Sequence, residues 1–237
     1  MDTRMIYNME ITMRRKNKGL TTYQRSYIKF KRGIDTALAA IGMTVLWPVF
    51  LGIVLAIKLE DGLTAPVLFT QKRVGINKSH FELYKFRSMK LDTPHDVPTH
   101  LLEDPEQYIT KVGKFLRKTS LDELPQIMNI LMGEMDVVGP RPALWNQFDL
   151  IEERDKYGAN DIRPGLTGWA QINGRDELEI EEKAKLDGYY IENIGVRMDL
   201  KCFFGTIKSV LKSDGVVEGG TGELKKRKKL RNKGKRK

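Results

Sequence analysis

One run of residues limits the fold more than any other feature. Residues 37–57 are 21 residues long and contain no charged side chain. An α-helix needs about 20 apolar residues to cross the hydrocarbon core of a bilayer, so this run is long enough to do so. A soluble domain of this size rarely contains such a stretch. The sequence therefore predicts that the chain contacts a membrane, and the open question is how.

A proline near the middle of this run argues against a simple crossing. Pro48 removes one helical hydrogen bond, and its ring clashes with the preceding turn. As helices, residues 37–47 and 49–57 would be about 16 and 13 Å long, and neither would cross a bilayer alone. Lysine and arginine flank the run on both sides, whereas a spanning helix usually has a one-sided excess. We therefore favour a re-entrant helix-break-helix over residues 26–60, with a kinked spanning helix as the alternative.

The overall basic charge belongs to one end of the chain. The formal net charge is +10, and residues 225–237 alone contain ten Lys or Arg and no acid, so the remainder is neutral. We expect residues 216–237 to form a disordered basic tail that contacts anionic lipid, although its residues do not distinguish lipid from RNA. Because the charge is not a property of the fold, a nucleic-acid partner is not expected.

The rest of the composition narrows the class of protein. Cys202 is the only cysteine, and the three histidines have no ligand-like spacing with it, which excludes a disulfide framework and a zinc site. Residues 1–25 form a polar arm without the features of a signal peptide. Residues 61–215 are long enough for one compact domain. Its pattern predicts an α/β fold that is mostly helical, with a small β-hairpin.

The hairpin is predicted from two short apolar-rich strands. Residues 66–71 and 80–86 have strand composition, and a glycine-containing turn at 75–78 joins them. Such a hairpin places Lys85 and Arg87 near one end, where clustered cations can bind phosphate groups. The alternative is a charged face that only meets solvent.

Two adjacent acids follow a helix-start signal. Ser120 and Glu123 have the spacing of a capping box, and an apolar run that continues to Gly133 predicts the helix behind it. Asp122 and Glu123 would then lie in the first turn, where free N–H groups and the helix dipole favour ionised carboxylates. An ionised Asp122 can act as a nucleophile or bind a hard cation. Alternatively, Glu123 only caps the helix.

Two arginines are predicted to lie beside these acids. Arg117 precedes Asp122 by five residues, across a corner between two predicted helices. Arg141 lies between Pro140 and Pro142, on backbone with little conformational freedom. A planar and always charged guanidinium on rigid backbone suits a phosphate clamp. The Pro-Arg-Pro sequence is equally consistent with a plain loop.

Taken together, these motifs resemble those of the bacterial sugar transferases, the monotopic polyprenyl-phosphate phosphoglycosyl transferases. The resemblance extends over roughly residues 26–213, and Pro48 matches the proline of the family's membrane-helix break. No single motif is specific, but their order along the chain is. The motifs are residues 85–89, 120–126, 139–142, 163–169 and 171–175.

The resemblance implies a reaction and a place for it. Family members move a sugar-1-phosphate from a UDP-sugar to a polyprenyl phosphate, usually undecaprenyl phosphate, with magnesium, and release UMP. They begin the assembly of capsule, exopolysaccharide or O-antigen. Residues 61–215 would be the catalytic domain on the cytoplasmic face of the inner membrane. With no room for the extra membrane domain of some relatives, the chain would be the minimal form.

The resemblance also implies roles for individual residues. Asp122 would be the nucleophile that carries the phosphosugar, and Glu123 would be either a magnesium-linked carboxylate or a base. Magnesium would be held by these two acids, and the glycine-punctuated loop near residue 171 would lie close to the site. The substrate phosphates and the rest of the substrate would be contacted by Lys85, Arg87, Arg117, Arg141, Gln171 and Arg175.

Several questions stay open at this stage. For Gln171 and Arg175, a purely structural role is as consistent with the sequence as substrate contact. The last predicted helix has an apolar face that either packs in the core or lies on the bilayer. The transferred sugar and the oligomeric state are not encoded in any motif. The alternative function is a non-enzymatic, membrane-anchored protein whose basic tail binds anionic lipid or nucleic acid.

Overall fold

The computed structural model describes residues 19–93, 105–174 and 178–212. Most of the predicted polar arm, the whole predicted basic tail and Arg175 lie outside these residues. The described part is mostly helical and contains two two-stranded sheets, which confirms the predicted fold class. With η for a 3-10 helix, the elements are α2 (Thr22–Asp61), β1 (Leu68–Val74), η1 (Ile76–Lys78), β2 (His80–Phe86), η3 (Pro105–Tyr108), α3 (Lys111–Thr119), η4 (Leu121–Glu123), α4 (Gln126–Met132), β3 (Asp136–Val138), α5 (Phe148–Asp155), β4 (Gly165–Thr167), α6 (Trp169–Ile172), α7 (Ile180–Glu192) and α8 (Val196–Lys212).

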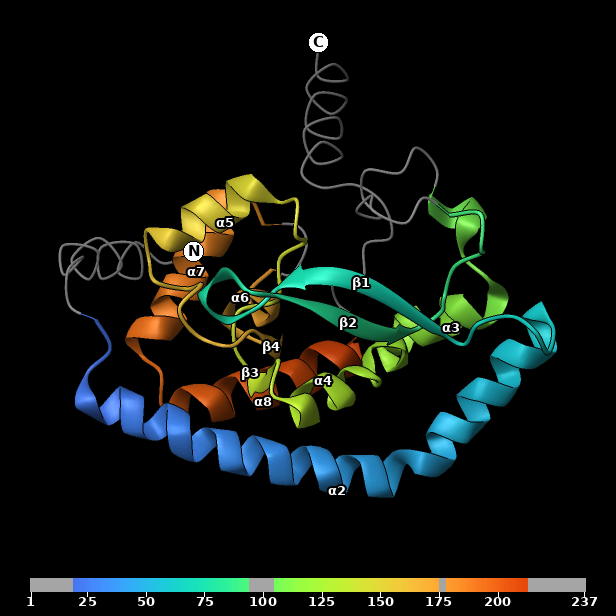
Figure 1. The fold of residues 1–237 in the computed structure, drawn as a ribbon, viewed down its shortest axis with the longest axis horizontal. Coiled ribbons are helices and arrows are strands. Elements are labelled where there is room, and N and C mark those ends of the chain that lie inside the picture. The colour runs from blue at the N-terminus through green and yellow to red at the C-terminus, as the bar shows by residue number, and fades with distance from the viewer. Residues whose placement is uncertain (1–18, 94–104, 175–177, 213–237) are drawn as a thin grey trace, which may run out of the picture.

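Helix α2 runs along one side of the whole molecule and bends partway along its length (Figure 1). It is 40 residues long and passes through Pro48 without interruption. The predicted helical break at this proline is therefore wrong. Proline removes a single hydrogen bond, and the bonds on either side of it can continue a bent helix.

Most of α2 is not covered by the rest of the protein. It is the one helix of the described residues that is long and apolar enough to cross a membrane, and only 11% of its most apolar window is buried. A core helix of a soluble protein would be mostly buried instead. Five of the large apolar side chains exposed along it are Ile34, Leu38, Ile41, Val45 and Leu55.

The N-terminal half of α2 is joined to the domain by a buried ionic network. Lys31 is 4% exposed, and its Nζ lies 2.9 Å from Oδ2 of Asp35 and 2.9 Å from Oδ2 of Asp199. The Tyr27 hydroxyl donates to the same Asp199 oxygen at 2.8 Å. Asp199 belongs to α8, so this network fixes the distance between the two long helices.

Other cations near the apolar run also make contacts within the protein. Arg32 donates to the carbonyl oxygens of Ile130 and Met135, at the end of α4 and just beyond it. Lys58 donates to two carbonyls of the loop that follows α2. These positive side chains on both sides of the run therefore contact the protein itself. Their distribution is for this reason weaker evidence for a re-entrant path.

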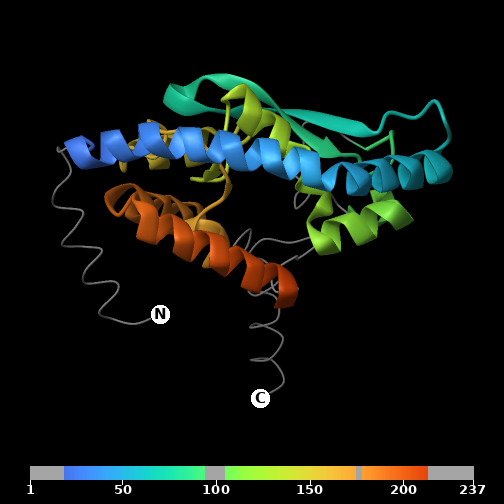
Figure 2. The same ribbon diagram turned by 90° about the horizontal axis from the view of Figure 1, so that it is seen from below.

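The predicted hairpin is confirmed. Strands β1 and β2 pair antiparallel, with Phe69 opposite Lys85 and Gln71 opposite Leu83. Phe81 and Leu83 of β2 pack in one apolar cluster with α4 and with the middle of α2. The hairpin thus lies on α4, which in turn lies on α2 (Figure 2).

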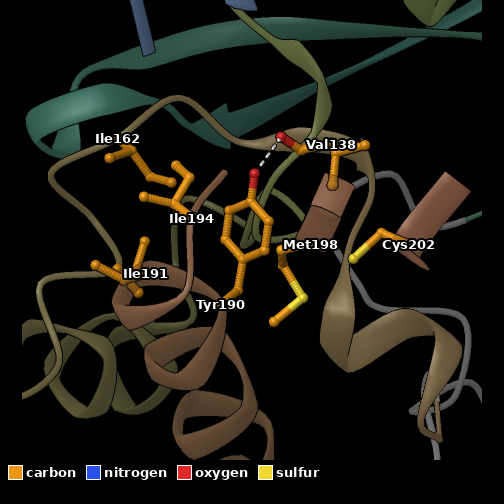
Figure 3. Packing of buried hydrophobic residues seen from close by; sticks show 8 residues of the cluster. Val138, Ile162, Tyr190, Ile191, Ile194, Met198 and Cys202 are labelled. Carbon is orange, nitrogen blue, oxygen red and sulfur yellow. Dashed lines mark hydrogen bonds between the residues drawn. The ribbon is translucent and has the colours of Figure 1, made fainter. Parts of the chain in front are cut away.

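A second apolar cluster lies around Tyr190 of α7 (Figure 3). The Tyr190 hydroxyl is within hydrogen-bond distance of the Val138 carbonyl, at 3.0 Å, and of Asp199 Oδ1, at 2.8 Å. Val138 ends strand β3, which pairs parallel with β4. Glycine is required at the start of β4, because a Cβ on Gly165 would lie 2.0 Å from the nitrogen of Gly139, the residue that follows β3. This close approach fixes the start of the loop that carries Arg141.

Candidate active site

The adjacent acids lie in a tight corner between two helices. Ser120 has φ 57°, in the left-handed region, and ends α3 without a side-chain cap bond. Leu121–Glu123 form a single 3-10 turn, and α4 begins only at Gln126. The predicted capping box is therefore wrong. An N-cap residue takes an extended backbone and accepts through its side chain, whereas Ser120 is left-handed and makes no such bond.

Glu123 is held between two cations. Lys85 Nζ lies 3.0 Å from its Oε1, Arg141 Nη2 lies 2.7 Å from the same oxygen, and Arg141 Nη1 lies 3.4 Å from Oε2. Burial by itself would raise the pKa of Glu123, but the Arg141 and Lys85 charges and hydrogen bonds lower it far below its ordinary value. Glu123 is therefore an anion at neutral pH, and it ties β2 to the loop after β3.

Asp122 has a different environment although it is the neighbouring residue. Its exposed fraction is 8%. Burial raises the pKa of Asp122 above its ordinary value, against the lowering effect of Lys85, and the Glu123 charge raises it further. The stabilising effect of a helix start that the sequence predicted is absent here, because the corner supplies a 3-10 turn and a dry environment. A carboxylate with a raised pKa is more basic, which suits a nucleophile.

Two arginines act on Asp122, as the sequence predicted. The charges of Arg117 and Arg141 both lower its pKa, so both lie close enough to interact with it. Arg117 comes from the last turn of α3 and Arg141 from the loop after β3. The structure therefore gathers Asp122, its neighbour Glu123 and three cations from separate segments at one point. Phosphate binding by these cations stays a prediction.

The Arg141 loop is held along the edge of the hairpin. Arg73 donates from Nη1 to the Pro142 carbonyl at 3.1 Å, and from Nη2 to Gln71 Oε1 at 2.6 Å. The Val74 N–H donates to the Ala143 carbonyl at 3.0 Å. Residues after Arg141 therefore run beside β1, where Arg73 and Leu144 form an isolated antiparallel bridge. The sequence pointed to no such role for β1.

A buried amide supports Lys85 from the other side. Asn129 of α4 is fully buried. Its Oδ1 accepts from the Tyr84 N–H at 3.1 Å, and its Nδ2 donates to the Glu82 carbonyl at 2.7 Å. Both bonds hold the β2 backbone just before Lys85. Asn129 is not among the residues predicted from the sequence, although an amide within the apolar stretch of α4 can indicate a buried polar contact.

The remaining predicted site residues are not brought to the acid pair by the described contacts. Arg87 is 6% exposed and donates to Asp61 Oδ2 at 2.8 Å and to the Pro66 carbonyl at 2.6 Å. Gln171 of α6 donates to the Leu166 carbonyl at 3.0 Å. Arg175 lies outside the described residues. Substrate contact by these three stays a prediction, and Arg87 has a clear packing role.

The acid pair offers two carboxylates to a magnesium ion. Among the residues that the structure describes, no group of three or more His, Cys, Asp or Glu is placed to hold a metal. Magnesium typically takes only one or two carboxylates and fills its other positions with water and substrate phosphates, so the pair has a suitable donor set. Both Glu123 oxygens already accept from cations. Asp122 is therefore the better carboxylate donor.

Comparisons with known proteins point to one protein family. The family model described as bacterial sugar transferase matches residues 26–213. EpsL of Bacillus subtilis, an uncharacterised sugar transferase, is 39% identical over 79% of this chain and 90% of that protein. The UDP-glucose:undecaprenyl-phosphate glucose-1-phosphate transferase of Escherichia coli is 40% identical over 75% of this chain and 39% of that protein. An N-acetylgalactosaminephosphotransferase of Aeromonas hydrophila that uses undecaprenyl phosphate is 36% identical over 80% of this chain. The chain spans less than half the length of these last two relatives, at 39% and 45%.

Proposed function

The chain belongs to the bacterial sugar transferase family, and on that premise we propose that it transfers a sugar-1-phosphate from a UDP-sugar to undecaprenyl phosphate. Two relatives are named as undecaprenyl-phosphate phosphosugar transferases, which supports this reaction class. The observation that carries the proposal is the corner in which buried Asp122 adjoins cation-paired Glu123, with Arg117 and Arg141 beside it. Such a corner can bring an attacking carboxylate and a bound diphosphate together.

In the first step, an Asp122 oxygen attacks the phosphorus next to the sugar. A bond forms between that oxygen and the phosphorus, and the bond to the bridging oxygen breaks, so that UMP leaves. The phosphosugar remains on the carboxylate. Burial favours this step because it makes Asp122 more basic than an ordinary aspartate.

In the second step, an oxygen of undecaprenyl phosphate attacks the same phosphorus. The bond to Asp122 breaks, the carboxylate is regenerated, and the product is undecaprenyl diphosphate-sugar. Splitting the exchange into two displacements allows one small site to serve a water-soluble donor and a lipid acceptor in turn.

The cations provide the phosphate binding that both steps need. Lys85 and Arg141 place two positive charges at Glu123 and close to Asp122, and lysine and arginine are the side chains that most often bind phosphate in proteins. Arg117 adds a third positive charge near the nucleophile. Positioning and charge stabilisation dominate phosphoryl transfer, so we assign these residues much of the rate enhancement.

Of the two roles implied for Glu123, acting as a base is the less suitable. A base works best when its pKa is near the working pH, whereas the cations hold the pKa of Glu123 far below its ordinary value. We assign Glu123 the role of orienting Lys85 and Arg141. Magnesium, held by Asp122 and substrate phosphate oxygens, would offset the repulsion between carboxylate and diphosphate.

Membrane attachment follows from two exposed apolar faces. The exposed face of α2 is one, and the outward face of α8 is the other, while its inward residues Met198 and Cys202 are buried in the core. Both helices are seen from the same side in Figure 2. We propose that this side lies on the cytoplasmic leaflet of the inner membrane and that the bent α2 enters it without crossing. The exposed large apolar residues of α8 include Val196, Leu200, Phe203, Phe204 and Ile207.

The experiment that tests the function is UMP release from a panel of UDP-sugars. The purified full chain is supplied with undecaprenyl phosphate and magnesium in detergent. We expect UMP release that depends on the lipid and is restricted to one or a few sugars. If folded protein turns over no sugar in the panel, the chain is better described as a non-enzymatic membrane-anchored protein.

A further inference from the structure

Helix α2 ends in two acids whose side chains contact two different segments that lead to the active-site corner. Glu60 accepts at Oε1 from the Lys111 N–H, at 2.7 Å, and at Oε2 from the Val112 N–H, at 2.8 Å. These are free N–H groups in the first turn of α3, so a side chain from another helix caps α3. Thr110 caps the same turn from within the chain, through the Gly113 N–H at 2.9 Å.

Helix α3 transmits this attachment to the catalytic acids. It is a nine-residue helix, it carries Arg117 in its last turn, and Ser120 ends it two residues before Asp122. A single short helix bends little, so fixing its start against Glu60 also fixes where its end lies relative to α2.

The neighbouring acid holds the other side of the corner. Asp61 Oδ2 accepts from Arg87 Nη2 at 2.8 Å, and Arg87 Nε donates to the Pro66 carbonyl at 2.6 Å. Arg87 follows Lys85 by two residues, at the end of β2. The strand that supplies a cation to Glu123 is therefore anchored to the same turn of α2 as the helix that precedes Asp122.

Apolar side chains of α2, α3 and β2 pack together near these two acids. We call this cluster, with the contacts of Glu60 and Asp61, the joint. Ile53 and Ile57 of α2 are buried in one cluster with Phe86 of β2 and Leu116 of α3. Ile57 is the last residue of the uncharged run, so the joint lies where the apolar part of α2 ends.

We propose that Glu60 and Asp61 are positioning residues that set the height of the Asp122 corner relative to the bilayer. This inference rests on the proposed function, in which the acceptor phosphate lies at the bilayer surface and the acceptor chain lies within it. If α2 held the corner at a different height from the acceptor phosphate, Asp122 and that phosphate could not meet. Displacement of a reacting group by about 1 Å can reduce a rate by 100-fold.

The first experiment compares transfer from preloaded enzyme to undecaprenyl phosphate in lipid vesicles and in detergent micelles. For Glu60→Ala we expect a fall of about 10-fold or more in vesicles and a clearly smaller fall in micelles, where the lipid phosphate is free to approach. Glu60→Gln keeps a carbonyl oxygen to accept one of the two bonds and should recover part of the loss. Equal losses in both media, or no loss, would overturn the proposal.

The matched control is Glu106→Ala, which removes another acid that contacts α3. Glu106 pairs with the Lys114 side chain at 3.7 Å, both groups are largely exposed, and the α3 backbone is not involved. We expect the same ratio of vesicle to micelle rates as for the unaltered protein. A wild-type chain that turns over in neither medium would refute the proposed function and not the joint.

A second experiment tests the joint without any turnover. Spin labels on Leu59→Cys and Lys118→Cys, in a Cys202→Ser background, report the distance between the end of α2 and the end of α3 in vesicles. We expect one narrow distance distribution, broadened by Glu60→Ala and unchanged by Glu106→Ala. A distribution that Glu60→Ala leaves narrow and unshifted would refute the positioning role.

Discussion

Arg141 and Glu123 form a two-point ion pair, with Nη2 to Oε1 at 2.7 Å and Nη1 to Oε2 at 3.4 Å. The pair joins the loop after β3 to the 3-10 turn that carries Asp122. Because the same Oε1 also accepts from Lys85, Glu123 is the point at which three separate segments meet. In the proposed reaction the two acids therefore have separate tasks, Glu123 in holding the cations together and Asp122 in bonding to phosphorus.

The first prediction concerns the nucleophile. Asp122→Asn keeps the volume of the side chain but removes the anionic oxygen, so both sugar-phosphate transfer and the covalent phosphosugar adduct should be lost. The measurement is mass spectrometry of the intact protein after incubation with UDP-sugar. Retention of membrane binding serves as the control for folding. An adduct of the phosphosugar on the Asn variant would exclude Asp122 as the nucleophile.

The second prediction concerns the two-point pair. Arg141→Lys keeps the charge but cannot make two parallel bonds, so we expect turnover to fall by about 10- to 100-fold. The thermal midpoint should change little, because Arg141 is partly exposed. Steady-state UMP release and a melting curve check the two parts. Full activity in the Lys variant would mean that charge alone suffices at this position.

The third prediction is a pH dependence. The ionised form of Asp122 is needed for attack, so activity should rise with pH on the acid side, through an apparent pKa above the ordinary aspartate value. Lys85 lowers the pKa of Asp122, so Lys85→Met should move this limb to higher pH as well as reduce the rate. Lys114→Met, which alters an exposed lysine on α3, is the matched control. An acid limb that stays in place, or moves to lower pH, would contradict the assignment.

Much of the site could be predicted from the sequence, and the failures have local physical reasons. The hairpin and the Gly133 helix end follow from patterns within about ten residues, and both are confirmed. The convergence of Arg117 and Arg141 on Asp122 is also found. Ser120 was misread because a serine can form an N-cap or a left-handed helix end, and the structure has the left-handed end. Spacing alone gave no indication of this.

Contacts between residues that lie far apart in the sequence could not be predicted from local patterns. Lys31 and Arg32 have the composition of a headgroup-facing cluster, yet partners about 100 residues or more away hold both of them. Pro48 was expected to break α2, but in the structure the helix continues as one bent helix. The packing role of Arg87 likewise depends on Asp61, which no motif contains.

The fourth prediction uses the buried carboxyl of Asp136. Burial, opposed by Lys31 and reinforced by Asp35, raises its pKa to about 6, and its Oδ1 has no hydrogen-bond partner among the described residues. The folded pKa lies above the unfolded value, so the native state binds the proton more tightly. The contribution of this group to stability should then be greatest below about pH 4 and should fall, by roughly 3 kcal/mol, as pH rises through 6. Asp136→Asn should flatten the change in thermal midpoint over that range, and an unchanged slope would refute the assignment.

The fifth prediction concerns the network that joins α2 to α8. Lys31→Met removes the cation that faces both Asp35 and Asp199, leaving two buried carboxylates without compensation. Breaking a buried ion pair in this way typically costs about 3–5 kcal/mol, so a large fall in the thermal midpoint in detergent is expected. Lys29→Met, two residues earlier on the same helix and outside the network, is the control.

Adding Asp199→Asn to Lys31→Met should recover part of the loss, because one uncompensated charge is removed while the hydrogen-bonding side chain remains. If the double variant were less stable than Lys31→Met alone, the network would owe its stability to the Tyr27 and Tyr190 bonds of Asp199 and not to charge compensation.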